Sequence, residues 1–121
     1  MSKKVLVIED NEKNIYLVTL ILEQHGYQVF QARDGINGIK KAETINPNLI
    51  LLDIQLPGLN GYAVARRIRS VPKLEHTPII AVTSFAMVGD REKAFEAGCT
   101  GYIEKPINLD TFIEEVENSF S

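Results

Sequence analysis

The stretch that decides the fold is Leu49–Tyr62, which reads LILLDIQLPGLNGY. Its four leading apolar residues run directly into a carboxylate, Asp53, and the segment after it contains Pro57, Gly58 and Gly61. An apolar residue at every position is typical of a strand that is buried on both faces of a parallel sheet. The pattern therefore predicts a central strand whose carboxyl end carries a charge, followed by a tightly turning loop.

The rest of the chain alternates short apolar runs with amphipathic segments. The runs VLVI and IIAV have the same unbroken apolar character as LILL. Repetition of a strand followed by a helix predicts an α/β domain, in which helices cover both faces of one doubly wound parallel sheet. We expect five strands at 5–8, 27–32, 49–52, 79–82 and 101–104. We expect five helices, of which four are at 11–24, 35–45, 89–97 and 109–120, and 64–69 lies within the third.

Length and composition narrow the class of protein. The chain has 121 residues, 45% of them hydrophobic, and a formal net charge of -3. No apolar run approaches the roughly 20 residues that a bilayer span needs, and no secretory leader precedes the first strand. Nucleic-acid-binding proteins usually carry a basic face, and the net negative charge of this chain does not favour one. We therefore expect a cytoplasmic protein that contacts neither nucleic acid nor membrane directly, with its single cysteine, Cys99, buried as a small apolar residue.

Polar side chains follow four of the expected strands at the points where these strands end. They are Glu9 and Asp10 after the first strand, Asp53 after the third, Thr83 and Ser84 after the fourth, and Lys105 after the fifth. In open α/β sheets, ligands bind beyond the carboxyl ends of the strands, where the winding direction switches. Taken alone, each of these residues has a common structural role as a cap, a turn former or a solvated lysine. Together they predict one polar site.

The carboxylates at this edge predict a metal ion. Adjacent parallel strands lie about 4.8 Å apart, so Asp10 and Asp53 come close together if the first and third strands are neighbours, with Glu9 beside them. Two like charges about 4 Å apart repel by about 4 kcal/mol at an effective dielectric constant of about 20. Such a cluster needs a cation or raised pKa values. Oxygen ligands favour a hard ion, with Mg²⁺ first and Mn²⁺ as its substitute.

Lys105 and Thr83 add an ammonium and a hydroxyl group to the same edge. Both groups suit an anion such as a phosphoryl group. With a hard ion and a carboxylate nucleophile, the set predicts phosphoryl transfer onto Asp53, because aspartyl phosphates are known covalent intermediates. Positioning and electrostatic stabilisation of the equatorial oxygens would carry the catalysis.

The whole chain resembles the receiver domains of bacterial two-component response regulators. The motifs KKVLVIEDN, LILLDIQLPGLNG, PIIAVTS and GYIEKPI carry the resemblance, and FAMVGDREKAFEAGC is similar to single-domain cell-cycle regulators of the DivK kind. The resemblance implies a flavodoxin-like (βα)5 fold with strand order 2-1-3-4-5. It also implies that residues 1–121 form one phosphoacceptor domain without an output domain.

The resemblance assigns roles to the site residues. It implies that Asp53 accepts the phosphoryl group from a phosphohistidine of a sensor histidine kinase or a phosphotransfer protein, so that the chain is a switch rather than an enzyme with a separate substrate. The groups implied to hold Mg²⁺ are Glu9, Asp10, Asp53 and the backbone carbonyl of Gln55. The groups implied to hold the phosphoryl group are Thr83, Lys105 and the backbone N–H of Ser84. The Lys105–Pro106 peptide bond is expected to be cis.

The resemblance also implies how the phosphorylated state is read. Tyr102 occupies the switch position and would rotate inward when Thr83 moves toward the phosphate. The surface of the fourth helix, fifth strand and fifth helix would then bind a downstream protein. Asn14 and Leu17 of the first helix would contact the phosphoryl donor protein.

The resemblance also implies that three positions near the phosphoacceptor influence the lifetime of the phosphate. Ser84 stands where the family usually has alanine or glycine, and its side chain would crowd Lys105 or add a hydrogen bond. Gln55 and Phe85 occupy positions that tune hydrolysis in the family. We expect Phe85 to shield the site from water.

Three alternatives share parts of the pattern. A haloacid-dehalogenase-like phosphatase also uses a strand-end aspartate, but it needs a second aspartate two residues later, where this chain has Gln55. A flavodoxin-like flavin binder needs a Ser/Thr/Gly-rich phosphate loop after the first strand, where this chain has the acidic EDNEKN. A receiver domain cut from a hybrid histidine kinase would show the same motifs.

Overall fold

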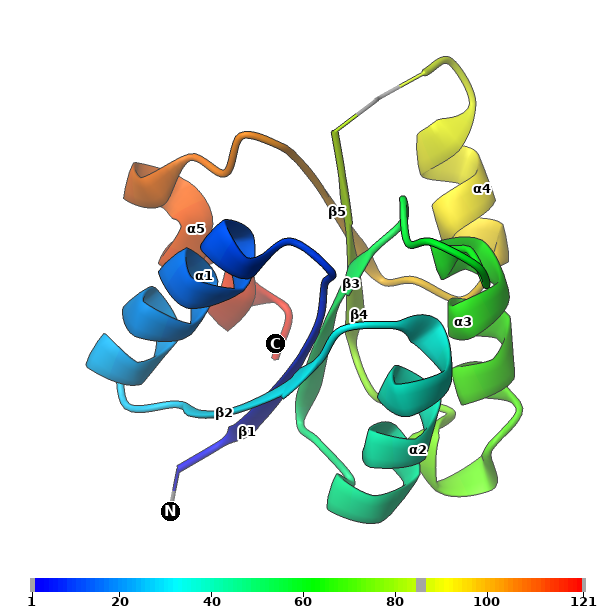
Figure 1. Cartoon of the computed structure of the whole chain (residues 1–121), viewed down its shortest axis with the longest axis horizontal. Helices are drawn as coiled ribbons and strands as arrows, with labels where there is room; N and C mark the ends of the chain where they lie inside the picture. The colour runs from blue at the N-terminus through cyan, green and yellow to red at the C-terminus, as the bar shows by residue number, and fades with distance from the viewer. Residues whose placement is uncertain (1, 85–86, 121) are drawn as a thin grey trace.

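The computed structural model describes residues 2–84 and 87–120. In these residues strands and helices alternate from the first element to the last (Figure 1). The elements are β1 (Lys4–Ile8), α1 (Glu12–Gln24), β2 (Gln28–Ala32), α2 (Gly35–Ile45), β3 (Leu49–Asp53), α3 (Gly61–Arg69), the 3-10 turn η1 (Pro72–Leu74), β4 (Ile79–Thr83), α4 (Asp90–Glu96), β5 (Gly101–Glu104) and α5 (Leu109–Asn118).

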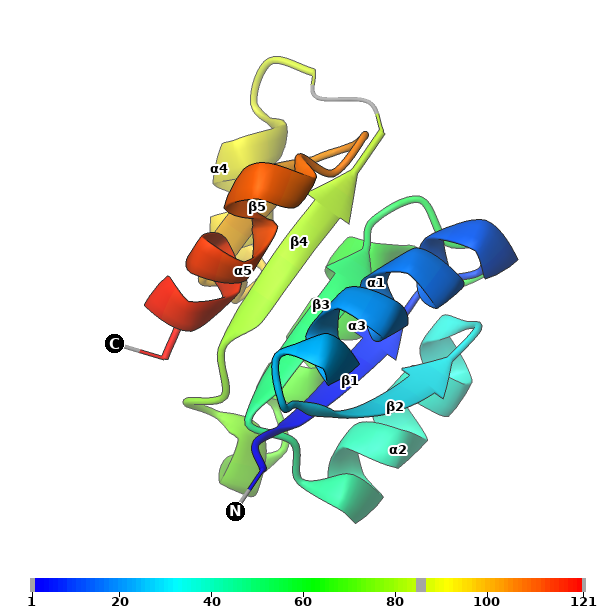
Figure 2. The same cartoon turned by 90° about the vertical axis from the view of Figure 1, so that its left-hand side faces the viewer.

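The strands form one parallel sheet in the order β2-β1-β3-β4-β5. This confirms the doubly wound α/β fold and the strand order implied by the receiver-domain resemblance. Helices α1 and α5 cover one face of the sheet, and α2, α3 and α4 cover the other (Figures 1 and 2). The central strand β3 is buried at all of its positions, as the LILLD pattern predicts.

Side chains of the central strands alternate between two cores because successive residues of a strand point to opposite faces. Leu6 and Ile50 pack with the helices α2, α3 and α4. Val7 and Leu51 pack with α1 and α5, where Phe112 is the largest fully buried side chain. With both faces packed, the sheet is a rigid base for the loops at its carboxyl edge.

The predicted segment 64–69 lies within α3, but the sequence pattern gave no start for this helix, which begins at Gly61. The side chain of Asn60 accepts a hydrogen bond from the backbone N–H of Ala63 (3.0 Å), and this cap stabilises a first turn that contains no apolar periodicity. Across residues 2–84 and 87–120, every helix is too short or too polar to cross a membrane.

Cys99 lies just before β5 and is buried, which confirms its predicted role as a small apolar residue. Burial raises the pKa of its thiol to about 11, although the charge of Arg69 acts in the opposite direction. A thiol with such a pKa stays protonated near neutral pH and is a poor nucleophile. Cys99 therefore belongs to the core and not to the chemistry of the protein.

The loop after β3 turns tightly because of two glycines. Gly58 has a φ of +77°, a left-handed conformation that side chains with a Cβ rarely adopt. At Gly61 the constraint is space, since a Cβ there would lie 2.5 Å from Cα of Ile54 and 2.7 Å from the carbonyl oxygen of Asp53. The N–H of Gly61 also donates to the carbonyl of Ile54 (3.0 Å), so the loop closes directly onto the end of β3.

We predict that Gly61→Ala lowers the free energy of unfolding by roughly 2–3 kcal/mol, because the new methyl group meets backbone atoms that cannot move aside. Gly58→Ala, which meets no atom within 4 Å, should cost only about 1 kcal/mol for its backbone conformation. Urea unfolding of both variants measures the difference. Equal losses would show that the close approach at Gly61 does not constrain the loop.

Candidate functional site

The carboxyl ends of the parallel strands point to one edge of the sheet (Figure 2), and the predicted polar residues stand at or just after these ends. Asp53 is the last residue of β3, and Thr83 is the last residue of β4. Glu9 and Asp10 directly follow β1, which pairs with β3 through Ile8 and Leu52. The neighbouring strands thus place these side chains together, as the sequence pattern predicts.

Three carboxylates form a cluster at this edge. Glu9, Asp10 and Asp53 each offer an oxygen atom that lies within 4.8 Å of the others. Glu9 is 6% exposed and Asp53 4% exposed, whereas Asp10 is open to solvent. Lys105 supplies a cation, with Nζ 2.7 Å from Oε1 of Glu9 and 3.4 Å from Oδ2 of Asp53. Lys105 precedes Pro106 through the expected cis peptide bond.

The electrostatic balance of the cluster is unfavourable for the buried acids. Burial raises the pKa of Glu9 above its usual value, and the neighbouring Asp53 raises it further. The hydrogen bond from Lys105 and the backbone N–H of Asn11 lower the pKa of Glu9 and offset part of this effect. Three acids therefore share one ammonium group, and the cluster is short of positive charge.

The residues present fit a hard divalent cation. The cluster offers only oxygen ligands, and its exposed member leaves a side open to water, which suits an ion that keeps part of its hydration shell. A cavity of about 420 Å³ lies over the cluster. Its lining residues are Glu9, Asp10, Asn11, Glu12, Asn14, Asp53, Gln55, Ser84 and Lys105. The cavity is large enough for an ion and a phosphoryl group together.

The side chain of Gln55 makes contacts that the sequence analysis missed. Its Nε2 donates to Oγ1 of Thr83, and its Oε1 accepts from the backbone N–H of Ser84 (2.9 Å). The backbone N–H of Gln55 donates to Oδ1 of Asp53 (2.9 Å). The sequence predicted a metal-binding carbonyl and an influence on hydrolysis for Gln55 but no side-chain contacts, although a long amide two residues after Asp53 was a signal that it could reach the neighbouring strand.

Of the predicted switch and partner residues that the structure describes, only Asn14 lines the cavity. Tyr102 lies on β5 beside Ala81 of β4, and the guanidinium of Arg91 is 5.9 Å from its ring centroid. On α1, Asn14 lines the cavity and Leu17 is 38% exposed one turn further along. Phe85, the predicted shield, lies outside the described residues.

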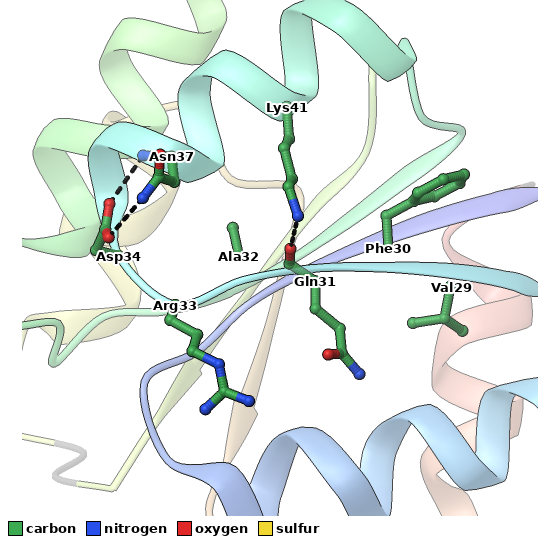
Figure 3. Close-up of a pocket in the computed structure, with 8 residues that line it drawn as sticks. All are labelled: Val29, Phe30, Gln31, Ala32, Arg33, Asp34, Asn37 and Lys41. Carbon is green, nitrogen blue, oxygen red and sulfur yellow. Dashed lines mark hydrogen bonds between the residues drawn. The ribbon is translucent and has the colours of Figure 1, made fainter.

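A larger hollow of about 650 Å³ lies along β2, and none of the three clustered acids lines it (Figure 3). Its polar groups already have partners. Asp34 caps α2 through Asn37, Lys41 donates to the carbonyl of Gln31, and Arg33 pairs with Glu12 at 3.2 Å. The chemistry therefore belongs to the smaller acidic cavity.

Comparison with known proteins points to one family. The family model of the response regulator receiver domain matches residues 5–117. The polar-differentiation response regulator DivK of Brucella ovis is 42% identical over 118 residues, which cover 98% of this chain and 96% of the relative. DivK of Brucella anthropi has the same identity and coverage.

Solved structures agree with this family. The receiver domain of a sensor histidine kinase from Pseudomonas aeruginosa, with a magnesium ion coordinated in its active site cleft, superimposes with a TM-score of 0.91. It is 33% identical, and the match covers 99% of this chain and 98% of that one. The chemotaxis protein CheY4 of Vibrio cholerae has a TM-score of 0.94 and 25% identity, with 98% of this chain and 99% of that one covered. The chain therefore belongs to the response regulator receiver domains of two-component signalling and is similar to DivK.

Proposed function

We propose that the chain is a phosphorylation-controlled switch in which Asp53 accepts a phosphoryl group from a phosphohistidine. The observation that carries the proposal is the position of Asp53, which is buried among carboxylates yet lines the cavity and lies 3.4 Å from the Lys105 ammonium. The chain has no separate substrate in this account. It catalyses its own phosphorylation and its own slow dephosphorylation.

The transfer follows from the groups around Asp53. A carboxylate oxygen of Asp53 attacks phosphorus in line, and a P–O bond forms as the P–N bond of the phosphohistidine breaks. The imidazole nitrogen of the donor keeps the electron pair of the broken bond. Lys105 offers positive charge to the phosphoryl oxygens, while the Thr83 hydroxyl and the Ser84 N–H donate hydrogen bonds to them.

The acidic cluster has a separate task, which is to hold a divalent ion. Asp10, Asp53 and the backbone carbonyl of Gln55 would be its ligands, with Glu9 acting through water. Bound there, Mg²⁺ or Mn²⁺ would neutralise charge on the phosphoryl oxygens. The magnesium-bound receiver domain of the Pseudomonas aeruginosa kinase supports this assignment.

The phosphorylated state would act through a surface. Tyr102 would turn inward as Thr83 engages the phosphate, and the surface of α4, β5 and α5 would change its affinity for a downstream protein. We propose a cytoplasmic protein phosphorylated by a sensor histidine kinase or a phosphotransfer protein. Since a kinase receiver domain is 33% identical, the second candidate is a receiver domain of a hybrid kinase with the same chemistry.

Replacing Asp53 by the neutral Asn tests whether the carboxylate cluster is short of positive charge. Asp53→Asn should raise the free energy of unfolding by about 1–2 kcal/mol in metal-free buffer, because it relieves carboxylate repulsion. Mg²⁺ should stabilise the native protein and stabilise this variant less, since a ligand stabilises the state that binds it. Urea unfolding with and without Mg²⁺ measures both effects.

Asp34→Asn, the same change at the exposed α2 cap, should respond to Mg²⁺ like the native protein. Equal responses in all three proteins would contradict the metal site.

Phosphorylation by a small donor tests the phosphoacceptor. In phosphoramidate and Mg²⁺, the native protein should gain the mass of one phosphoryl group, and Asp53→Asn should gain none because its amide is not a nucleophile. Intact-protein mass spectrometry is the measurement, with Asp110→Asn on α5 as a control that is labelled normally. A label that persists in Asp53→Asn would place the phosphoacceptor elsewhere.

Exposed apolar residues of α1 test the donor surface. Leu17→Asp should slow transfer from a phosphorylated histidine phosphotransfer protein roughly tenfold, because a charge would be buried in the interface. Labelling by phosphoramidate should not change, since this donor needs no protein surface. Val88→Asp, an exposed apolar residue before α4, serves as the control. If both donors react as fast with Leu17→Asp as with the native protein, α1 is not the donor surface.

A further inference from the structure

We propose that the open edge of β2 is a docking site for an acidic, extended segment of another protein. Lys41 covers this edge in the unbound protein and releases it when a carboxylate of the incoming segment binds the lysine ammonium. The site is the hollow along β2, which none of the three clustered acids lines. The inference therefore does not depend on the phosphoacceptor role of Asp53.

The backbone of β2 has hydrogen-bonding groups that face away from the sheet. β2 is an edge strand that pairs only with β1, and the N–H of Gln28 donates to the carbonyl of Lys3. Because alternate residues of a paired strand face the same neighbour, the peptide groups of Gln28 and Phe30 point to β1. Those of Val29 and Gln31 point to the open edge, where a further strand can bond to them.

The hollow beside this edge has room for such a strand. Its volume is about 650 Å³, and its walls come from β2 and from Asn37 and Lys41 of α2 (Figure 3). Val29 and Phe30 line it and are only half-buried, so they offer apolar surface that an added strand would cover. The edge thus combines open peptide groups with a place for side chains of a partner.

Lys41 closes the edge through a single contact. Its ammonium reaches from α2 to the carbonyl of Gln31, which is one of the outward groups (Figure 3). A lysine placed over an edge strand hinders pairing with another chain. The acceptor is a neutral carbonyl, and Lys41 takes part in no ion pair in the described part of the chain. A carboxylate binds an ammonium more strongly than a carbonyl does, because both partners are then charged.

The charges of the hollow select an acidic partner. Its lining carries two cations, Arg33 and Lys41, against one acid, Asp34. Both carboxylate oxygens of Asp34 already accept hydrogen bonds from Asn37. An acidic strand therefore leaves every group bonded, because its carboxylate takes the Lys41 ammonium and one of its N–H groups takes the carbonyl that Lys41 leaves. A neutral or basic strand offers Lys41 no charged acceptor in exchange.

The test is an NMR titration of the full chain at low ionic strength with a capped peptide of alternating valine and glutamate, which presents its glutamates on one face of a strand. This peptide should bind roughly fivefold more tightly than the same peptide with glutamine, the upper range for an exposed ion pair. A peptide with lysine in these places should bind more weakly than both. Binding should slow hydrogen exchange of the Val29 and Gln31 amides and leave that of Phe30, which faces β1, nearly unchanged.

Lys41→Gln tests the lysine charge, because glutamine keeps a hydrogen-bond donor. This variant should bind the glutamate and glutamine peptides equally. Lys40→Gln is the matched control, since it removes the same charge from the preceding exposed residue of α2, which is outside the lining of the hollow, and it should keep the fivefold preference. Asp53→Asn should bind both peptides like the native protein, so the outcome is separate from that of the proposed function.

Other results would overturn the inference. If the glutamate peptide does not bind at millimolar concentration, or binds without slowing exchange at Val29 and Gln31, the edge is not its docking site and Lys41 only protects β2. An equal preference for glutamate in the native protein and in Lys41→Gln would show that Lys41 does not recognise the carboxylate. Slower exchange of Val29 and Gln31 that grows with protein concentration in the absence of peptide would assign the edge to a second copy of the chain.

Discussion

Repulsion among carboxylates at the carboxyl edge of the sheet is the constraint on which the rest of the structure depends. Glu9 and Asp53 are buried, Asp10 lies within 4.8 Å of both, and Lys105 forms ion pairs with Glu9 and Asp53. The raised pKa of Glu9, caused mainly by burial, is the local sign of this imbalance. Folding therefore builds an edge with an excess of negative charge, which a divalent ion would neutralise in our proposal.

The sheet makes this arrangement durable, because β3 and β4 are buried throughout and cannot shift to relieve the repulsion. The close approach of Gly61 to Ile54 fixes the loop beyond Asp53 in the same way. Side chains at the rim of the cavity, such as Gln55 beside the end of β4, are held on this base.

The sequence predicted the elements whose signals are local. Unbroken apolar runs located the central strands, and polar residues after them located the site, because the carboxyl ends of parallel strands meet at one edge. The strand order came from the family resemblance, since no local pattern specifies which strands pair.

The Gln55 bridge to Thr83 and Ser84 escaped prediction because it depends on a side-chain conformation between segments distant in sequence. The start of α3 was not predicted, because Asn60 and Gly61 continue no apolar stripe and the Asn60 cap defines that turn. The roles of the site residues remain predictions.

Paramagnetic broadening by Mn²⁺ tests the central claim most directly, because it locates a bound divalent ion without requiring phosphorylation. In spectra of the metal-free protein, substoichiometric Mn²⁺ should broaden first the backbone amide signals of Asp10, Asn11, Ile54 and Gln55, and excess Mg²⁺ should restore them. Broadening centred on another part of the molecule, or broadening near Asp53 that excess Mg²⁺ does not reverse, would contradict the account.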